Sequence, residues 1–199
     1  LASFCREDRL KSIVAGIDSA MFYDELGPKQ QAFIQEQQLF FTATAPENGR
    51  INLSPKGLDS FRCLDEKSVM YLDLTGSGNE TAAHIMENGR MTIMFCSFKG
   101  KPLILRLYGR GEVIAINSPR WQELSSQFPD MPGTRQIILL HIESVQSSCG
   151  FGIPQYELIE ERSTLTDWAD KKGPDGIEKY WVDKNMKTID DADTGLEWK

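Results

Sequence analysis

Two short segments of the chain carry side chains that could hold a phosphate group. The first runs from Arg50 to Gly57 and offers Asn52, Ser54 and Lys56 as donors. The second begins about twenty residues later, and its donors are Thr75, Ser77, Asn79 and Thr81. A phosphomonoester is dianionic, so it favours a cation together with several short N–H or O–H donors. The two segments together provide that combination.

Both segments are predicted to be β-strands whose ends carry these donors. The second, Tyr71–Thr81, leads directly into a helical pattern. Free backbone N–H groups and the helix dipole make the start of a helix favourable for an anion. Two donor-rich strand ends in a mostly antiparallel sheet therefore predict a site for a phosphate-bearing cofactor.

The composition is that of an ordinary globular protein. The 199 residues are 40% hydrophobic and 26% charged, which fits a single domain over 1–199 with a sizeable core. The net charge of -7 argues against binding to nucleic acid or to an anionic membrane, because either partner favours a basic face. Any phosphate is therefore expected on a single small molecule.

Further sequence features indicate the cellular location and whether a metal site is expected. The longest apolar runs are too short to span a bilayer, and the chain turns charged after Leu1–Cys5, so no complete signal peptide is seen. We expect a cytoplasmic protein, although a chain that begins at Leu leaves targeting open. The four cysteines are scattered and the two histidines lack ligand spacing, so no metal site is expected.

Turn chemistry and apolar periodicity predict strands interrupted by short helices. Strands are predicted over Leu39–Thr44, Arg50–Ser54, Val69–Leu74, Met91–Phe98, Leu103–Ile116, Gln136–Val145 and, shorter, Tyr156–Glu160. Helices are predicted over Asp24–Gln38, Asn79–Asn88, Ser118–Phe128, Thr164–Lys172 and Asp175–Lys184, with Gly89 as a left-handed cap and the last dozen residues frayed. Hairpin-linked strands with a few helices indicate an antiparallel barrel with helical additions.

Two predicted strands are apolar on both faces. Met91–Cys96 and Ile137–Leu140 have apolar side chains at nearly every position, so neither face can lie in water. One face is expected to fill the barrel, and the other to meet a helix or a second subunit. A homodimer is the resulting hypothesis.

Three motifs make the chain resemble the pyridoxamine 5'-phosphate oxidase-related family of FMN-binding split barrels. They are Ile51–Gly57, Leu74–His84 and Leu105–Gly111, and Ser148–Pro154 resembles an uncharacterised branch of the same family. The resemblance implies a mainly β fold, a six-stranded antiparallel split barrel over 24–160 with a C-terminal helical extension over 161–199. It also implies a homodimer that binds FMN at its interface and acts on a small molecule.

The resemblance further implies roles for particular residues. A stretch along the flavin and its ribityl chain would comprise Asn52, Leu53, Ser54 and Lys56. The phosphate would be held by the turn that contains Thr75, Ser77, Asn79 and Thr81. Arg106 would point toward the ring or the phosphate edge.

Two departures from the family pattern matter. The vitamin-forming oxidases place Arg-Lys in the phosphate turn, whereas this chain has Gly78-Asn79, so the cationic role falls to Lys56, Arg106 or Arg62. Those oxidases recognise their substrate with an Arg and a His near the C-terminus, whereas no His follows His141 here. Oxidation of pyridoxamine phosphate itself is therefore not expected.

Structural roles compete with these assignments. Lys56 could be a solvated turn lysine, and Ser77 and Asn79 are also ordinary helix caps. Arg106 lies between apolar neighbours and needs either a carboxylate such as Glu112 or a cofactor phosphate. The loop Cys149–Pro154 is expected to be structural or gating, with Phe151 near the flavin.

The main prediction is an FMN-dependent oxidoreductase. No protein nucleophile or acid–base pair stands out, so no catalytic residue is assigned, and a flavin supplies its own chemistry. The alternatives are a non-catalytic flavin-binding or storage module and a purely structural dimer. The deazaflavin F420 is less favoured, because its polyglutamyl tail favours a basic groove.

Overall fold

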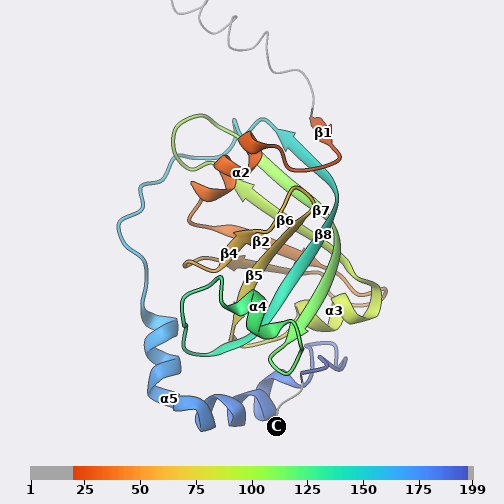
Figure 1. Ribbon diagram of the computed structural model, residues 1–199, viewed down its shortest axis with the longest axis vertical. Helices are drawn as coiled ribbons and strands as arrows, with labels where there is room; N and C mark the ends of the chain where they lie inside the picture. The colour runs from red at the N-terminus through yellow and green to blue at the C-terminus, as the bar shows by residue number, and fades with distance from the viewer. Residues whose placement is uncertain (1–19, 197–199) are drawn as a thin grey trace, which may run out of the picture.

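The computed structural model describes residues 20–196, and its centre is one curled antiparallel sheet (Figure 1). The strands are β1 (Met21–Tyr23), β2 (Phe40–Thr44), β3 (Asn52–Lys56), β4 (Phe61–Cys63), β5 (Ser68–Leu74), β6 (Arg90–Cys96), β7 (Ile104–Ala115) and β8 (Thr134–Ser148). They follow the order β3-β2-β6-β7-β8-β5-β4, and β1 pairs with the last part of β8. The main path therefore begins at β3 and ends at β4.

Short helices cover the two ends of the sheet. The helix α2 (Pro28–Gln35) lies near β1, whereas α3 (Glu80–Asn88) and α4 (Trp121–Ser125) lie at the opposite end (Figure 1). After β8 the chain runs along the side of the barrel to α5 (Thr164–Tyr180), which continues into η1 (Trp181–Asn185). Gly173 has φ 65° and precedes Pro174, so α5 consists of two helical pieces that meet at a kink, as the two predicted helices require.

Alternation along the strands divides the buried apolar side chains into two layers. The inner layer fills the barrel with side chains such as Phe40, Tyr71 and Phe95. The outer layer packs Leu72 and Leu139 against α4. The strands that are apolar on both faces therefore bury one face inside the barrel.

The inside of the barrel changes from apolar to polar toward the end that α3 covers. In the register of β2 and β3, Thr42 lies opposite Ser54 and Thr44 lies opposite Asn52. Asp73 enters the same region from β5 and is only 3% exposed. A polar barrel end of this kind needs internal partners for its buried groups.

Side chains join β3 to β5, although these strands are not neighbours in the sheet. Lys56 Nζ lies 2.8 Å from Asp73 Oδ1. Asn52 Nδ2 donates to Thr81 Oγ1, at the start of α3, over 3.0 Å. The barrel is therefore split along this line, and polar side chains close the split where a backbone ladder is missing.

The predicted class, a mainly β antiparallel split barrel with added helices, is confirmed, with eight strands within residues 20–196 in place of six. The additional strands β1 and β4 have 3 residues each, too few to give a periodic signal. The strand predicted over Tyr156–Glu160 is wrong. That segment has no sheet partner, although the Tyr156 N–H donates to Phe98 O at 3.0 Å.

Some helix ends also differ from the prediction. The first helix begins at Pro28 rather than Asp24, and α4 is shorter than the predicted Ser118–Phe128, because a backbone bond from Trp121 N to Ser118 O makes the start a turn. Within the described residues 188–196 the predicted fraying is wrong, since Thr194 and Leu196 are buried. Residues 197–199 and the segment Leu1–Cys5 lie outside the described residues.

Residues 20–196 contain no helix long and apolar enough to cross a membrane. In the same range, no three His, Cys, Asp or Glu side chains gather as metal ligands.

Candidate functional site

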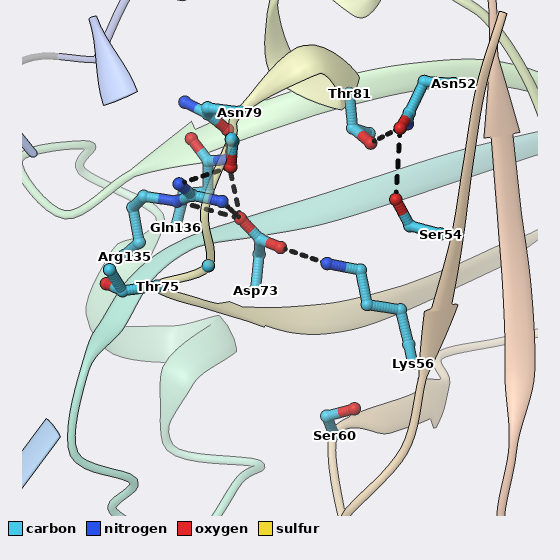
Figure 2. A network of polar contacts seen from close by, with 12 residues as sticks. Asn52, Ser54, Lys56, Ser60, Asp73, Thr75, Asn79, Thr81, Arg135 and Gln136 are labelled. Carbon is cyan, nitrogen blue, oxygen red and sulfur yellow. Dashed lines mark hydrogen bonds and ion pairs between the residues drawn. The ribbon is translucent and has the colours of Figure 1, made fainter. Parts of the chain in front are cut away.

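A buried carboxylate stands at the centre of the polar barrel end. Asp73 Oδ1 accepts from Lys56 Nζ at 2.8 Å, and Asp73 Oδ2 accepts from Arg135 Nη2 at 2.7 Å and from Gln136 Nε2 at 2.9 Å (Figure 2). Gln136 Nε2 also lies 2.7 Å from Asn79 Oδ1. Side chains from β3, β5 and β8 and from the residue before α3 thus meet in one network.

The network carries a net positive charge, because Lys56 and Arg135 bring two cations to the single Asp73 carboxylate. Burial alone would raise the pKa of Asp73, but the Arg135 guanidinium and the Lys56 ammonium outweigh burial and hold that pKa well below its usual value. Asp73 is therefore ionised at neutral pH. One positive charge remains in a chain whose overall charge is -7.

Lys56 is the cation of the network that can meet a ligand. The Arg135 guanidinium is 3% exposed, and beyond Asp73 its Nη1 donates to Gly78 O at 3.0 Å and to Asn185 Oδ1 at 2.8 Å. The Lys56 side chain is 23% exposed. An ammonium has three donors, and Asp73 takes one of them.

A second group of donors lies beside Lys56 on the same face of β3. Ser54 Oγ donates to Asn52 Oδ1 at 3.1 Å, and Asn52 Nδ2 donates to Thr81 Oγ1 at 3.0 Å (Figure 2). Alternation along the strand directs Asn52, Ser54 and Lys56 into the split. The structure therefore brings donors of both sequence segments together.

Three buried polar atoms in the same region have no hydrogen-bond partner among residues 20–196: Thr42 Oγ1, Tyr71 OH and Asn79 Nδ2. Burial and the Asp73 carboxylate raise the pKa of Tyr71 well above its usual value, so the phenol stays protonated. The Thr42 and Thr81 hydroxyls oppose this rise weakly without reaching hydrogen-bond geometry. Unpaired buried polar atoms are unfavourable, so this region favours an additional polar group.

A pocket of about 550 Å³ opens beside Lys56, and we call it the Lys56 pocket. Part of its wall is apolar and includes the turn glycine, namely Leu39, Pro55, Leu58, Leu72, Leu74, Gly76, Leu158 and Leu165. The rest is polar and includes the charged side chains Glu160, Glu161 and Arg162. Apolar walls with a few polar groups are typical of small-molecule sites. A larger hollow of about 820 Å³ beside α4 is lined by no cation in the described part of the chain.

The predicted phosphate-binding residues of the turn differ in where they point. Thr75 is buried, and its hydroxyl donates to Gly133 O at 2.7 Å and accepts from Trp181 Nε1 at 2.8 Å. Asn79 is also buried, at 2% exposure. Ser77 is exposed, so among these three residues it offers the accessible hydroxyl.

Leu53 and Arg106 lie on the outer face of the sheet, away from Asp73. Leu53 is 63% exposed. Arg106 stands between the inward-pointing Leu105 and Leu107, and its Nη1 donates to Ser148 Oγ at 3.1 Å. Glu112, the carboxylate considered as one possible partner of Arg106, pairs with Arg120 and His141 instead. Within one protomer, Arg106 does not join the Lys56 network.

Arg62 and Phe151 also lie away from the Lys56 pocket. Arg62 binds Asp59 through Nη1 at 2.6 Å and Nη2 at 3.0 Å, and its guanidinium lies 4.8 Å from the Phe128 ring centroid. Phe151 is 53% exposed in the loop after β8. Arg62 is therefore engaged with Asp59 and Phe128 and does not join the Lys56 network.

Sequence reasoning misses Asp73 and its partners Arg135, Gln136 and Asn185. One signal is present, because a carboxylate within the buried strand Tyr71–Leu74 requires a cation nearby. The identity of that cation is not a local property, since Arg135 follows Asp73 by 62 positions.

The fold and this polar split define the class of split-barrel proteins with a candidate anion site. Residues 26–149 match the family described as pyridoxamine 5'-phosphate oxidase. The match covers more than half of the chain, which therefore belongs to the pyridoxamine 5'-phosphate oxidase family.

Individual relatives agree with this membership. A pyridoxamine 5'-phosphate oxidase family protein of Aspergillus flavus, ustO, is 44% identical over 149 residues, or 72% of this chain. The match spans 60% of that protein, less than two thirds of its length.

Solved structures show the same fold. A putative pyridoxamine 5'-phosphate oxidase from Lactobacillus delbrueckii matches with a TM-score of 0.50 and 21% identity, over 62% of this chain and 94% of that chain. A single-site variant of HupZ from Group A Streptococcus matches with a TM-score of 0.50 and 22% identity, over 61% of this chain and 98% of that chain.

Proposed function

We propose that this chain is a flavoprotein that binds FMN and acts as an oxidoreductase on a small molecule. The supporting observation is the Lys56 ammonium, which borders a partly apolar pocket of about 550 Å³ and keeps donors beyond its bond to Asp73. When bound, FMN supplies the redox chemistry, while the protein supplies binding and electrostatics. Membership of the pyridoxamine 5'-phosphate oxidase family supports the same proposal.

The residues present fit both parts of FMN. The phosphate would meet Lys56 and the Ser77 hydroxyl beside a network with one excess positive charge, and the ring would lie on the leucine walls of the Lys56 pocket. The ribityl hydroxyls would replace contacts within the Asn52, Ser54 and Thr81 cluster.

Acidic groups near the site oppose the phosphate. Glu160 and Glu161 line the Lys56 pocket together with Arg162, and Glu80 lies at the turn. The Glu80 carboxylate folds over Gly78, so closely that a Cβ at Gly78 would overlap it. As an acidic residue in the first turn of α3, Glu80 stabilises the helix itself. Binding of a phosphate is therefore expected to displace this carboxylate from the turn.

The proposed assembly is a homodimer with the flavin at its interface. On and beside β3, Ile51 is 77% and Leu53 is 63% exposed, which leaves apolar surface for a partner. Leu53 and Arg106 both lie on this outer face. A second copy seated there would bring them toward a flavin bound between the protomers, in the roles that the family resemblance implies for them.

The test is to purify the full chain and record its absorption spectrum, then to titrate the apoprotein with FMN by flavin fluorescence. We expect a flavin spectrum or saturable quenching. Colourless protein that leaves added FMN fluorescence unchanged contradicts the proposal. Bound FMN that neither NADH nor NADPH reduces favours the non-catalytic flavin-binding or storage module.

A further inference from the structure

The C-terminal segment after the barrel packs against the turn that follows β5. Its buried apolar cluster comprises Ala169, Ile177, Trp181 and Leu196. Gly133 lies between this segment and the turn, since a Cβ there would lie 2.9 Å from Ala169 Cβ and 3.8 Å from Thr75 Cβ. The approach is close enough for polar contacts to form across it.

Two side chains of η1 make those polar contacts. Trp181 Nε1 donates to Thr75 Oγ1 at 2.8 Å, and Asn185 Nδ2 donates to Gly76 O at 3.1 Å. Asn185 Oδ1 also accepts from Arg135 Nη1 at 2.8 Å. Trp181 is 6% exposed and Asn185 is 0% exposed, so water does not compete for these bonds.

Two side-chain contacts, one from Asn185 of η1 and one from Arg135 of β8, fix the direction of two peptide groups in the turn. The Gly76 carbonyl is held by Asn185, and the Gly78 carbonyl is held by Arg135 at 3.0 Å. In a planar trans peptide, the N–H of the following residue points opposite to the carbonyl. The Ser77 and Asn79 N–H groups therefore point away from Arg135 and Asn185.

We propose that Trp181 and Asn185 are positioning residues that hold the Thr75–Asn79 turn with its Ser77 and Asn79 amides presented to the phosphate of FMN. The proposal rests on the proposed function, because it names what preorganises the phosphate contact of that site. It also assigns a role to a segment that lies outside residues 26–149, the part that matches the family. Fixed N–H donors bind an anion better than a mobile turn does, since no ordering is required on binding.

The test compares FMN with riboflavin, which lacks the phosphate, on the full-length chain. Trp181→Phe removes the indole donor but keeps an apolar ring, and Asn185→Ala removes both Asn185 contacts. Each is expected to raise the Kd for FMN about tenfold, the effect of about 1.4 kcal/mol, and to change the Kd for riboflavin less than about twofold. Trp168→Phe is the matched control, because Trp168 packs on Tyr180 at 5.1 Å and is expected to leave both Kd values unchanged.

A second measurement does not depend on flavin. Amide hydrogen exchange at Ser77 and Asn79 of the apoprotein is expected to accelerate in Trp181→Phe and to stay at the wild-type rate in Trp168→Phe. If Asn185→Ala does not fold, the Trp181→Phe results decide alone.

The possible outcomes distinguish a failure of the positioning role from a failure of the proposed FMN binding. Equal weakening of FMN and riboflavin, or unchanged FMN affinity in Trp181→Phe, overturns the positioning role and leaves FMN binding intact. A wild-type chain that binds neither flavin overturns the proposed function and this inference with it.

Discussion

In the proposed function Lys56 is available to a ligand phosphate, because Asp73 does not depend on Lys56 alone. Arg135 contacts Asp73 Oδ2 through both Nε at 3.1 Å and Nη2 at 2.7 Å, so two guanidinium donors meet one carboxylate oxygen. The buried carboxylate is thus compensated by Arg135 even when the ammonium turns partly to another oxyanion. Together, Lys56, Asp73 and Arg135 keep one net positive charge.

Replacement of Lys56 by methionine keeps much of the side-chain volume and removes the charge. We expect the Lys56→Met variant to bind FMN roughly tenfold to a hundredfold more weakly, since a hydrogen bond to a charged group contributes about 1.5–3 kcal/mol. Fluorescence titration measures the change. The exposed Lys101 is the control, and Lys101→Met is expected to bind FMN as the wild type does. Equal affinity of the two variants would contradict the assignment.

The Asp73 carboxylate predicts a particular dependence of stability on pH. Its folded-state pKa lies below the unfolded value of about 3.9, so ionised Asp73 stabilises the fold above that pH. This contribution is lost as the pH falls from about 4 toward the folded-state pKa. Asp73→Asn removes the contribution at every pH.

We expect Asp73→Asn to lower the free energy of unfolding at pH 7 by roughly 3–5 kcal/mol, because Arg135 is left buried without its carboxylate. The deficit should shrink as the pH is lowered, and urea unfolding at several pH values measures it. Asp59, which is 66% exposed in its pair with Arg62, supplies the control Asp59→Asn with a small change. Parallel pH profiles of wild type and Asp73→Asn would count against this account.

At the scale of the element, the start of α3 has two functions that conflict. The helix is stabilised by an acidic side chain in its first turn, whereas the proposed phosphate favours an uncharged one. Asn79 occupies the N-cap position without a side-chain cap bond, since its Oδ1 accepts from Gln136. The N-terminus of α3 is therefore built less for helix stability than for the network beside it.

Glu80→Gln tests this conflict, because the variant is expected to strengthen FMN binding and to weaken the stability of the fold. We expect FMN to bind about two- to fivefold more tightly, since the repulsion of one partly exposed carboxylate, about 0.5–1 kcal/mol, is removed. The free energy of unfolding should fall by about 0.5 kcal/mol. Glu87→Gln removes the same charge near the other end of α3 and should leave FMN affinity unchanged. Weaker FMN binding in Glu80→Gln would contradict the proposed repulsion between Glu80 and the phosphate.

The elements that could be predicted from sequence are those with a local cause. The end of α3 is predicted from Gly89, which has φ 71° and donates its N–H to Ile85 O at 2.8 Å. The β2–β3 hairpin follows from the turn before Arg50. By contrast, Arg135 and Asn185 reach the split through contacts with residues 57 to 109 positions away, and no local pattern marks them.

At the scale of the whole molecule, the proposed homodimer depends on the outer face of the sheet, which carries the exposed Leu53. We expect Leu53→Asp to convert a dimer into a monomer in sedimentation velocity, because a carboxylate would be buried without a partner in the interface. The control Ile159→Asp changes a residue that is 93% exposed in the segment before α5, and should remain dimeric. A wild-type chain that sediments only as a monomer at micromolar concentration contradicts the dimer.

Pro55 limits the pairing of another strand at the free edge of β3. The β2–β3 register is unbroken and places Pro55 opposite Phe41, so the position without an N–H faces the open side. A strand from another molecule finds no donor there and cannot extend the sheet by a complete ladder. The same strand that turns Asn52, Ser54 and Lys56 inward thus protects the protein from edge-to-edge aggregation.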